Sequence, residues 1–289
     1  MPELPEVETV RRGLANTAVG YTVNEVEIFD KRALRKNLGS ISSFCKSLLG
    51  SKLVDFERRG KFLWMPLREN RCLVIHLGMS GQILVRKPNE PADRCERVRI
   101  KAAKGKSELE IRFIDQRLFG GIYLDELIDQ GLLGAVPKSV QHIALDPLDE
   151  NFNLEEVTLR ISKRSAGIKS LLLNQQILSG LGNIYADETL WLTKTHYLSP
   201  GNSLSKRHLR QVIKTAKEVL VSAVAQNGTS FDEQFKNVNG EGGYFFHLLN
   251  AYGRTGQPCK RCKHPIIREP WSNRGSHFCL KCQKPHVPG

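Results

Sequence analysis

Four cysteines near the C-terminal end of the sequence are spaced in a way that can hold a metal ion. Cys259 and Cys262 form one Cys-x2-Cys pair, and Cys279 and Cys282 form a second. Each pair can direct two thiolates at one ion, and two pairs complete the tetrahedral sulfur shell that suits Zn²⁺. Because four sulfur ligands leave no open coordination position, the pattern predicts one structural zinc ion. Two disulfides or an iron–sulfur cluster are the alternatives, and the spacing favours zinc.

The second residue can supply a reactive amine. Removal of the initiator methionine would expose the secondary amine of Pro2, whose pKa lies nearer neutrality than that of a lysine side chain. A neutral amine can attack the anomeric carbon of a sugar and form an iminium ion, as lysines do in Schiff-base enzymes. Glu3 and Glu6 lie within one turn of it, where a carboxylate could move protons. From these residues alone, an ordinary helix start is the better explanation.

The charge of the chain points to an anionic partner. The 289 residues include 43 Lys and Arg against 30 Asp and Glu, so the net charge is +13. This excess favours nucleic acid, although a basic surface can also serve solubility alone. No stretch approaches the roughly 18 apolar residues of a membrane span, and the first ten residues do not resemble a signal peptide. With seven cysteines, four of them in close pairs, the composition predicts a soluble intracellular protein.

The elements that would position these residues change type along the chain. After one helix that starts near Pro5, short apolar runs separated by glycine turns predict strands, which suggests a sandwich or barrel. These runs are 23–28, 53–56, 62–65, 72–76, 82–85, 98–100, 109–114 and 121–124. Helical spacing of apolar residues then takes over, with a glycine turn at 179–183. The predicted helices are 154–161, 168–178, 184–192 and 209–226.

The predicted domains follow this change of pattern. Residues 1–135 would form an N-terminal β-sandwich domain with a flanking helix, and residues 136–153, which contain two prolines, would form a linker. Residues 154–244 would form a helical domain that ends in a polar, glycine-rich loop, and residues 245–289 would form a zinc-finger domain. The predicted fold class is therefore α+β with several domains.

Several segments of the chain resemble, in order, the motifs of the formamidopyrimidine-DNA glycosylase family. They are MPELPEVETVRRGL at the start, RGKF at 59–62, HLGMSG at 76–81, DQRLFG at 115–120, GLGNIYADE at 180–188 and the cysteine pairs. The resemblance spans nearly the whole chain. It implies a bacterial, monomeric 8-oxoguanine and formamidopyrimidine glycosylase with AP lyase activity on damaged double-stranded DNA. It also implies a β-sandwich, a helix–two-turn–helix domain and a β-hairpin zinc finger.

The resemblance assigns catalytic roles. Pro2 would be the nucleophile at C1′ of the damaged nucleotide, and its iminium ion would allow β- and then δ-elimination. Glu3 would donate a proton near the sugar ring, and Glu6 would be an acidic partner in the same pocket. Lys61 would bind a phosphate that flanks the lesion, and Arg274, on the zinc hairpin, would grip the lesion-flanking phosphates.

Three further side chains would fill the space that an everted base leaves. A base must leave the duplex stack before its glycosidic carbon can be attacked, and the resemblance assigns Met79, Arg117 and Phe119 to the vacated space. Met and Phe are apolar wedges, and Arg can bond the orphaned partner base. The glycines beside them favour exposed loops over core positions. Leu118 departs from the Arg that some family members carry, which would tune DNA contacts without removing activity.

The resemblance adds contacts from other parts of the chain. Asn183 lies at the start of a helix, whose backbone amides suit phosphate, and Lys169 would be a second phosphate contact. His76 belongs to the expected DNA-binding set. Glu188 would hold the glycine turn or help the lesion pocket, and the loop after Asn227 would close over an everted 8-oxoguanine.

Two other functions fit part of these residues. An endonuclease VIII-like glycosylase would share the fold and chemistry but prefer oxidised pyrimidines. Leu4, Met79 and the long loop after Gly228 favour the purine branch. A non-catalytic damaged-DNA-binding zinc protein would share the fold alone, and the presence of Pro2, Glu3 and Lys61 argues against it.

Overall fold

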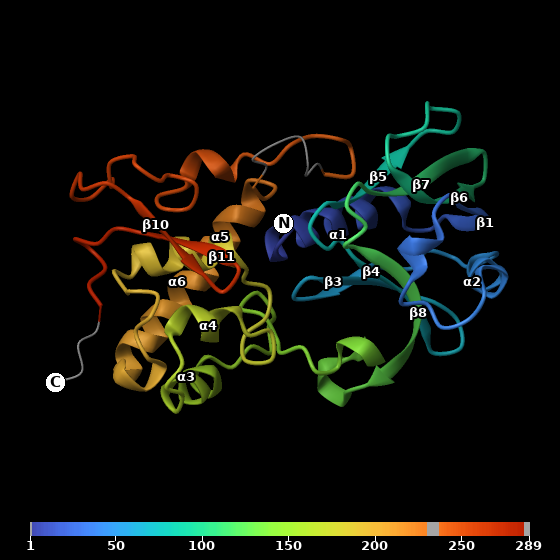
Figure 1. Ribbon diagram of the computed structural model, residues 1–289. Coiled ribbons are helices and arrows are strands. Elements are labelled where there is room, and N and C mark those ends of the chain that lie inside the picture. Colours follow the sequence, from blue (N-terminus) through green and yellow to red (C-terminus); the bar gives the residue numbers. More distant parts are fainter. Residues whose placement is uncertain (1, 230–236, 286–289) are drawn as a thin grey trace. The chain divides into compact units, whose positions relative to one another are not determined.

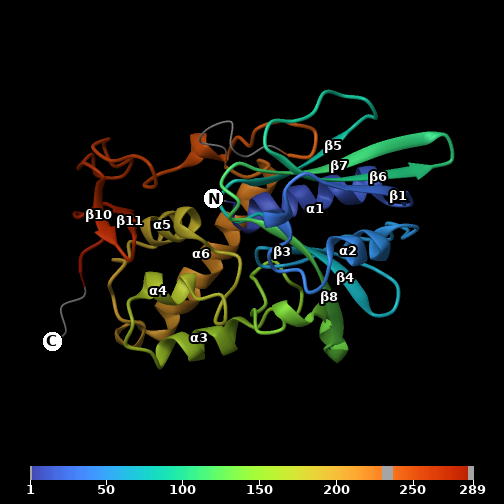
Figure 2. The same ribbon diagram turned by 45° about the vertical axis from the view of Figure 1, so that its right-hand side comes forward.

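The structure is a computed structural model that describes residues 2–229 and 237–285 (Figures 1 and 2). The chain divides into two compact units. The first comprises residues 1–142 and 226–244, and the second comprises residues 143–225 and 245–289. None of the helices in the described part of the chain combines the length and apolar composition that crossing a membrane requires.

Two antiparallel sheets form most of the first unit. One sheet has the order β2 (Glu57–Arg59), β3 (Phe62–Pro66), β4 (Arg71–His76), β8 (Gly121–Asp129) and β9 (Ala135–Pro137). The other has the order β1 (Thr22–Ile28), β6 (Glu96–Lys104), β7 (Ser107–Asp115) and β5 (Gly81–Arg86). Along β6 buried residues alternate with more exposed ones, the period-two pattern of a strand with one face in a core.

One hydrophobic core joins the two sheets and two helices. α1 (Leu4–Ala18) buries Val7, Val10 and Leu14 in it. α2 (Ile41–Leu48) buries Phe44 and Leu48 in the same core. Apolar residues of both sheets complete it, among them Leu63, Leu73, Ile75, Ile83, Ile100, Ile111 and Phe113. The predicted β-sandwich with a flanking helix is confirmed.

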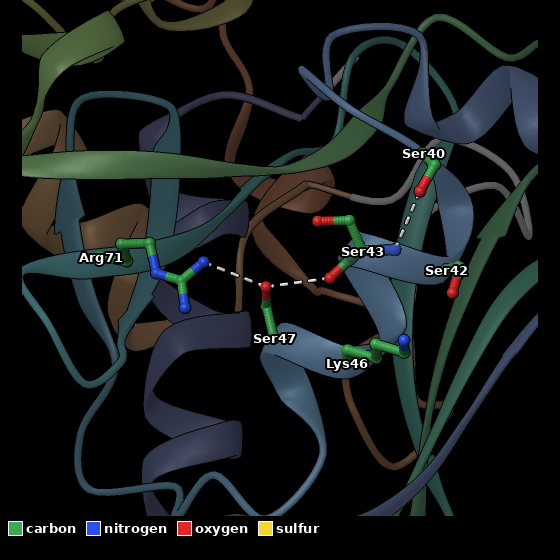
Figure 3. A pocket seen from close by; sticks show the side chains of 6 residues that line it. All are labelled: Ser40, Ser42, Ser43, Lys46, Ser47 and Arg71. Atoms are coloured by element: carbon green, nitrogen blue, oxygen red, sulfur yellow. Dashed lines mark hydrogen bonds between the residues drawn. The ribbon is translucent and has the colours of Figure 1, made fainter.

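α2 is not predicted from the sequence. Ser40 caps it by accepting the backbone N–H of Ser43 at 3.1 Å, and Arg71 Nη1, at the start of β4, donates to Ser47 Oγ at 3.0 Å (Figure 3). These residues line a pocket beside the helix together with Ser42 and Lys46. None of the pocket residues is a predicted site residue.

Two more segments differ from the sequence prediction. The strand predicted at 53–56 is an irregular segment, and regular pairing begins at Glu57. The predicted linker 136–153 starts inside β9, which pairs with the end of β8 through Leu127 and Pro137. The last strand of the five-stranded sheet therefore lies in a stretch whose prolines suggested a linker.

Helices dominate the second unit. They are α3 (Leu154–Ser162), α4 (Ile168–Leu173), α5 (Asn183–Leu192) and α6 (Lys206–Ala225). α6 buries the predicted apolar face, including Leu209, Val212 and Leu220, and packs against α3 and α5. A hairpin of β10 (Ile267–Trp271) and β11 (Arg274–Phe278) packs its second strand on α5. The predicted helical region and C-terminal hairpin are confirmed.

Candidate functional site

The N-terminal residues form a capped helix start. Glu3 precedes α1, Pro5 lies in its first turn, and Glu6 Oε2 accepts the backbone N–H of Glu3 at 2.8 Å. This capping box satisfies backbone donors that a helix start leaves unpaired. Pro2 is buried, and Glu3 and Glu6 are each 1% exposed. The structure thus brings together the three residues predicted for the N-terminal site.

The second oxygen of Glu6 holds the chain that follows α6. Glu6 Oε1 accepts the backbone N–H of Thr229 at 2.7 Å. Gly228 has a φ of +81°, and a Cβ at this position would lie 2.6 Å from Glu6 Oε1. Glycine is required here by both the conformation and the close approach. Glu6 therefore joins the helix start to the loop after α6, which is a positioning task.

The described parts of that loop, 226–229 and 237–244, cluster with the first unit, although the sequence places them with the helical domain. Val238 packs on Gly13, and its carbonyl accepts the backbone N–H of Val85 at 2.8 Å. Its anchors thus come from α1 and the four-stranded sheet. The rest of the predicted lesion-capping loop, 230–236, lies outside the described residues.

Lys61 lies in the two-residue turn between β2 and β3. The glycine before it has a φ of +55°, a left-handed conformation that glycine adopts without strain. The two preceding arginines have internal partners: Arg58 donates to Glu8 at 3.0 Å, and Arg59 donates to Gln130 at 2.8 Å. Arg58 and Arg59 therefore hold the fold, whereas Lys61 is half-buried at the tip of the turn.

His76, at the end of β4, lies among cations. Burial, together with the charges of Lys36, Lys61 and Arg35, lowers the pKa of His76 to about 4. Its ring packs against Phe62, with the ring centroids 4.7 Å apart. Three cations thus act on this one imidazole, so the surroundings of His76 are electropositive and suit a phosphate backbone.

The three predicted wedge residues lie on two loops whose backbones touch. Met79 is 41% exposed and Phe119 is 52% exposed, and Arg117 is also exposed. Gly78 has a φ of +62°, and a Cβ there would lie 2.4 Å from the backbone nitrogen of Gly120. The structure therefore brings the three residues together and leaves their side chains outside the core.

Asp115, which sequence reasoning did not single out, ties these two loops to each other. Its side chain is fully buried. Oδ1 accepts the hydroxyl of Ser80 at 2.5 Å and the backbone N–H of Arg117 at 3.2 Å, and Oδ2 accepts the backbone N–H of Gly120 at 2.7 Å. Its place at the head of the segment 115–120 was the sequence signal that could have indicated this role.

Arg274 lies at the tip of the β10–β11 hairpin in the second unit. Ser272 and Asn273 connect the strands with φ values of +44° and +58°, as a tight two-residue hairpin turn requires. Arg274 is exposed. Asn183, the first residue of α5, donates from Nδ2 to the carbonyl of Gly275 at 3.0 Å. Asn183 is thus hydrogen-bonded to the residue that follows Arg274, so the structure places these two predicted phosphate-binding residues close together.

Lys169 has a different place from the predicted one. Its side chain is fully buried, and Nζ lies 2.6 Å from Asp187 Oδ1. Nζ also donates to the carbonyl of Gly275 at 3.1 Å and to Ser276 Oγ at 2.8 Å. A direct phosphate contact needs an ammonium group at the surface, so this geometry does not support one. Lys169 instead holds the turn that carries Arg274.

Glu188 holds the chain that enters the C-terminal segment. Its carboxylate accepts the backbone N–H groups of Asn250, Ala251 and Tyr252 at 2.8, 2.7 and 2.9 Å, and the amide of Asn250 at 3.0 Å. Burial raises the pKa of Glu188, and these hydrogen bonds act against the rise. Glu188 thus holds a turn, but at 250–252 and not at the glycine turn 179–183.

The four paired cysteines converge on one point. All four Sγ atoms lie within 4.8 Å of one another, and Cys262 Sγ lies 3.4 Å from the Sγ atoms of Cys279 and Cys282. A tetrahedral ion with sulfurs at about 2.3 Å separates the sulfurs by about 3.8 Å, whereas a disulfide needs about 2.05 Å. The cluster therefore has the donor set and spacing of a four-coordinate metal site.

Two family models match the chain. The first, described as the formamidopyrimidine-DNA glycosylase N-terminal domain, matches residues 1–122. The second, described as the formamidopyrimidine-DNA glycosylase H2TH domain, matches residues 143–234.

Relatives and solved structures agree over nearly the full length. The formamidopyrimidine-DNA glycosylase of Thermobifida fusca is 44% identical over 288 residues, which are 98% of this chain and 97% of the relative. That of Corynebacterium glutamicum strain R is 45% identical over 292 residues, which are 98% and 99% of the two chains. A Lactococcus lactis FPG variant in complex with Fapy-dG-containing DNA is similar with a TM-score of 0.85 at 30% identity, over 98% of this chain and 100% of that one. The L. lactis glycosylase bound non-covalently to DNA with an AP site has a TM-score of 0.84 at the same identity and coverage.

Proposed function

The chain belongs to the formamidopyrimidine-DNA glycosylase family, and we propose that it is a bifunctional DNA glycosylase and AP lyase of base excision repair. Its proposed substrates are oxidised purines, namely 8-oxoguanine and formamidopyrimidines, in double-stranded DNA. The observation that carries the proposal is the N-terminal site, where Pro2 and Glu3 are buried at the capped start of α1. The net charge of +13 supports a polyanionic substrate.

Pro2 is the proposed nucleophile. With the initiator methionine removed, the lone pair of its amine attacks C1′ of the damaged nucleotide, the C1′–base bond breaks, and the departing base takes up a proton. The nitrogen loses its own proton and then forms an iminium ion as the C1′–O4′ bond opens. Glu3 is the proposed donor of the proton that O4′ receives.

The iminium ion makes strand cleavage possible. It withdraws electrons from C2′, so that loss of a C2′ proton expels the 3′ phosphate by β-elimination. A second elimination expels the 5′ phosphate, and water then hydrolyses the iminium ion to a carbonyl group and frees Pro2. Glu6, whose two oxygens accept backbone N–H groups, is proposed to position this site and not to transfer protons.

Binding of the DNA backbone is proposed to come from four residues. Lys61 and His76 would contact phosphate from the first unit, and Asn183 and Arg274 would do so from the second. Lys169 would act through the hairpin turn and not on phosphate, since its ammonium group is buried. Met79, Arg117 and Phe119 would fill the space of the everted base.

Zinc is the proposed occupant of the cysteine cluster. Cys259, Cys262, Cys279 and Cys282 would hold one Zn²⁺ as thiolates, and the ion would contribute folding free energy to a short C-terminal segment. No coordination position would remain for a catalytic water.

We also propose that the chain is monomeric and that it lies in the bacterial cytoplasm with the DNA. Experiment can distinguish the proposed function from two rival functions. One is an endonuclease VIII-like preference for oxidised pyrimidines, and the other is damaged-DNA binding without catalysis.

Borohydride trapping tests the proposed function. The purified protein is mixed with an 8-oxoguanine·cytosine duplex, or with an oxidised-pyrimidine duplex, in the presence of borohydride, which reduces the iminium ion to a stable amine. Mass analysis of the N-terminal peptide should show a DNA adduct on Pro2 that forms preferentially with 8-oxoguanine. Preference for the pyrimidine duplex would favour the endonuclease VIII-like function. Absence of an adduct with either duplex, despite a free Pro2 amine, would favour binding without catalysis.

A further inference from the structure

Arg35 contacts the backbone of the wedge loop at two points. It follows the 3-10 turn Lys31–Leu34 and is exposed. Its Nη2 donates to the carbonyl of Phe119 at 2.7 Å, and its Nη1 donates to the carbonyl of Leu118. The two nitrogens of one planar guanidinium thus bind consecutive carbonyls, a forked contact that a lysine cannot make.

The backbone that Arg35 binds is strained. Leu118 has a φ of +56°, in the left-handed region that side chains with a Cβ disfavour. The loop donors on either side, the N–H groups of Arg117 and Gly120, are held by Asp115. Arg35 binds the carbonyls between them. Asp115 therefore binds the N–H groups of this short segment and Arg35 binds its carbonyl groups, and the strained Leu118 lies between the contacts.

We propose that Arg35 is a positioning residue for base eversion, which holds Leu118 in its left-handed conformation so that Arg117 and Phe119 point into the duplex. This inference rests on the proposed function, because it assigns Arg35 to the wedge that the function requires. Neither Arg35 nor Asp115 needs to touch a base for this task. Arg35 acts through the two carbonyls, and the neighbouring side chains contact the DNA.

A different role for the same residue is a phosphate contact. Arg35 is one of the cations whose charge lowers the pKa of His76. The two roles predict different responses to substitution. A phosphate contact depends on charge and is largely kept by lysine, whereas positioning depends on the forked contact and on the strain at Leu118.

The experiment compares four variants with the wild-type full-length protein. They are Arg35→Ala, Arg35→Lys, the double variant Arg35→Ala/Leu118→Gly, and Lys31→Ala, a matched control that removes an exposed cation from the adjoining turn. Two readouts are taken: the single-turnover rate of 8-oxoguanine excision from a duplex, and the fluorescence rise of 2-aminopurine placed beside the lesion, which reports unstacking.

Arg35→Ala and Arg35→Lys should both lower the excision rate by about tenfold, which corresponds to about 1.4 kcal/mol, and should diminish the fluorescence rise. Lys31→Ala should stay within about twofold of the wild type. The double variant should recover most of both readouts, because glycine adopts the left-handed conformation without strain and no longer needs Arg35. Recovery by glycine is a result that a phosphate contact would not produce.

Three results would overturn the proposal: full activity of Arg35→Lys, equal losses in Arg35→Ala and Lys31→Ala, or failure of Leu118→Gly to restore activity to a folded double variant. Thermal melting of each variant establishes that it is folded. If the wild type unstacks the duplex without excising the base, the proposed function fails, and the fluorescence comparison still decides the role of Arg35.

Discussion

Replacing Lys169 by methionine tests the buried charges beneath the hairpin. Lys169 and Asp187 are 0% and 1% exposed, and 2.6 Å separates Nζ from Oδ1. Methionine fills most of the same volume without a charge. The substitution therefore leaves the Asp187 carboxylate buried with its contacts to His277, whose backbone N–H and ring Nδ1 lie 2.9 and 3.1 Å from Oδ2.

The expected cost is large because the Asp187 carboxylate stays buried after it loses the ammonium group that lies 2.6 Å away. Removing one partner of a buried ion pair costs about 3–5 kcal/mol, since the other charge stays desolvated. The carbonyl of Gly275 and the hydroxyl of Ser276 lose a charged donor as well. The loss is a large share of the roughly 5–15 kcal/mol that stabilises a typical domain.

The chain offers a matched control at the surface. Arg210 and Glu155 are also 2.6 Å apart, but their side chains are 39% and 62% exposed. An ion pair in that setting contributes about 0–1 kcal/mol. Arg210→Met should therefore change the stability little, although it removes a pair with the same separation.

Urea unfolding of the full-length variants measures both effects through the midpoint and slope. DNA affinity measured in parallel should fall for Lys169→Met, because the turn that carries Arg274 loses its support. A double variant, Lys169→Met/Asp187→Leu, should regain part of the stability, since no carboxylate is then left without its partner. Equal small effects of Lys169→Met and Arg210→Met would refute the reasoning, because they would show that burial does not determine the value of this pair.

Four further predictions address the remaining parts. Pro2→Gly should lose borohydride trapping and most strand cleavage while binding damaged duplex normally; a matching loss of affinity would reveal a role beyond chemistry. Cys279→Ser should release zinc on metal analysis and weaken DNA binding, and unchanged affinity of the zinc-free protein would contradict a structural role for the ion. Gly78→Ala places a Cβ 2.4 Å from the backbone nitrogen of Gly120 at a φ of +62°, so 8-oxoguanine excision should fall at least about tenfold; an unchanged rate would show that the two loops need not touch. The lowered pKa of His76, about 4 against 6.5, means that the stability owed to its neutral form is complete above pH 6.5 and is lost as the pH falls through 4. The urea midpoint of His76→Gln should accordingly fall less between pH 7 and pH 4 than that of the wild type, by up to about 3 kcal/mol in unfolding free energy, and parallel curves would contradict this assignment.

Local patterns predicted most of the elements. Glycine turns separated the strands of the first unit, and the apolar stripe from Leu209 to Val224 predicted α6. α2 was not predicted because it buries only two residues, Phe44 and Leu48, which are too few to show a helical period in the sequence. β9 was not predicted because its residues lie in a proline-containing stretch. Its extended structure depends on pairing with β8, which the local sequence does not show.

Site residues with a distinctive type and spacing could be predicted from the sequence. Residues whose place depends on partners far along the chain could not. The cysteine pairs indicate a metal site by residue type and spacing, whereas the role of Pro2 comes from the family resemblance and stays a prediction. Lys169 was predicted to contact phosphate because the sequence does not show that its ammonium group is buried. That burial depends on Asp187 and on a carbonyl 106 positions further along the chain. Arg35 showed no signal, because the carbonyls that it binds lie 83 and 84 positions further along the chain.

The long sequence separations in the second unit have a consequence for synthesis on the ribosome. Glu188 of α5 accepts the backbone N–H groups of Asn250, Ala251 and Tyr252, and Asp187, which pairs with Lys169, also accepts the backbone N–H of His277. Both carboxylates therefore receive hydrogen bonds from residues that are synthesised last. Until that segment emerges, burying α5 would leave Glu188 without these hydrogen-bond donors, which opposes early compaction. The helices of this unit should therefore complete their packing only after translation has reached the final cysteine pair, and chains truncated before the hairpin should be recognised and degraded as unfolded.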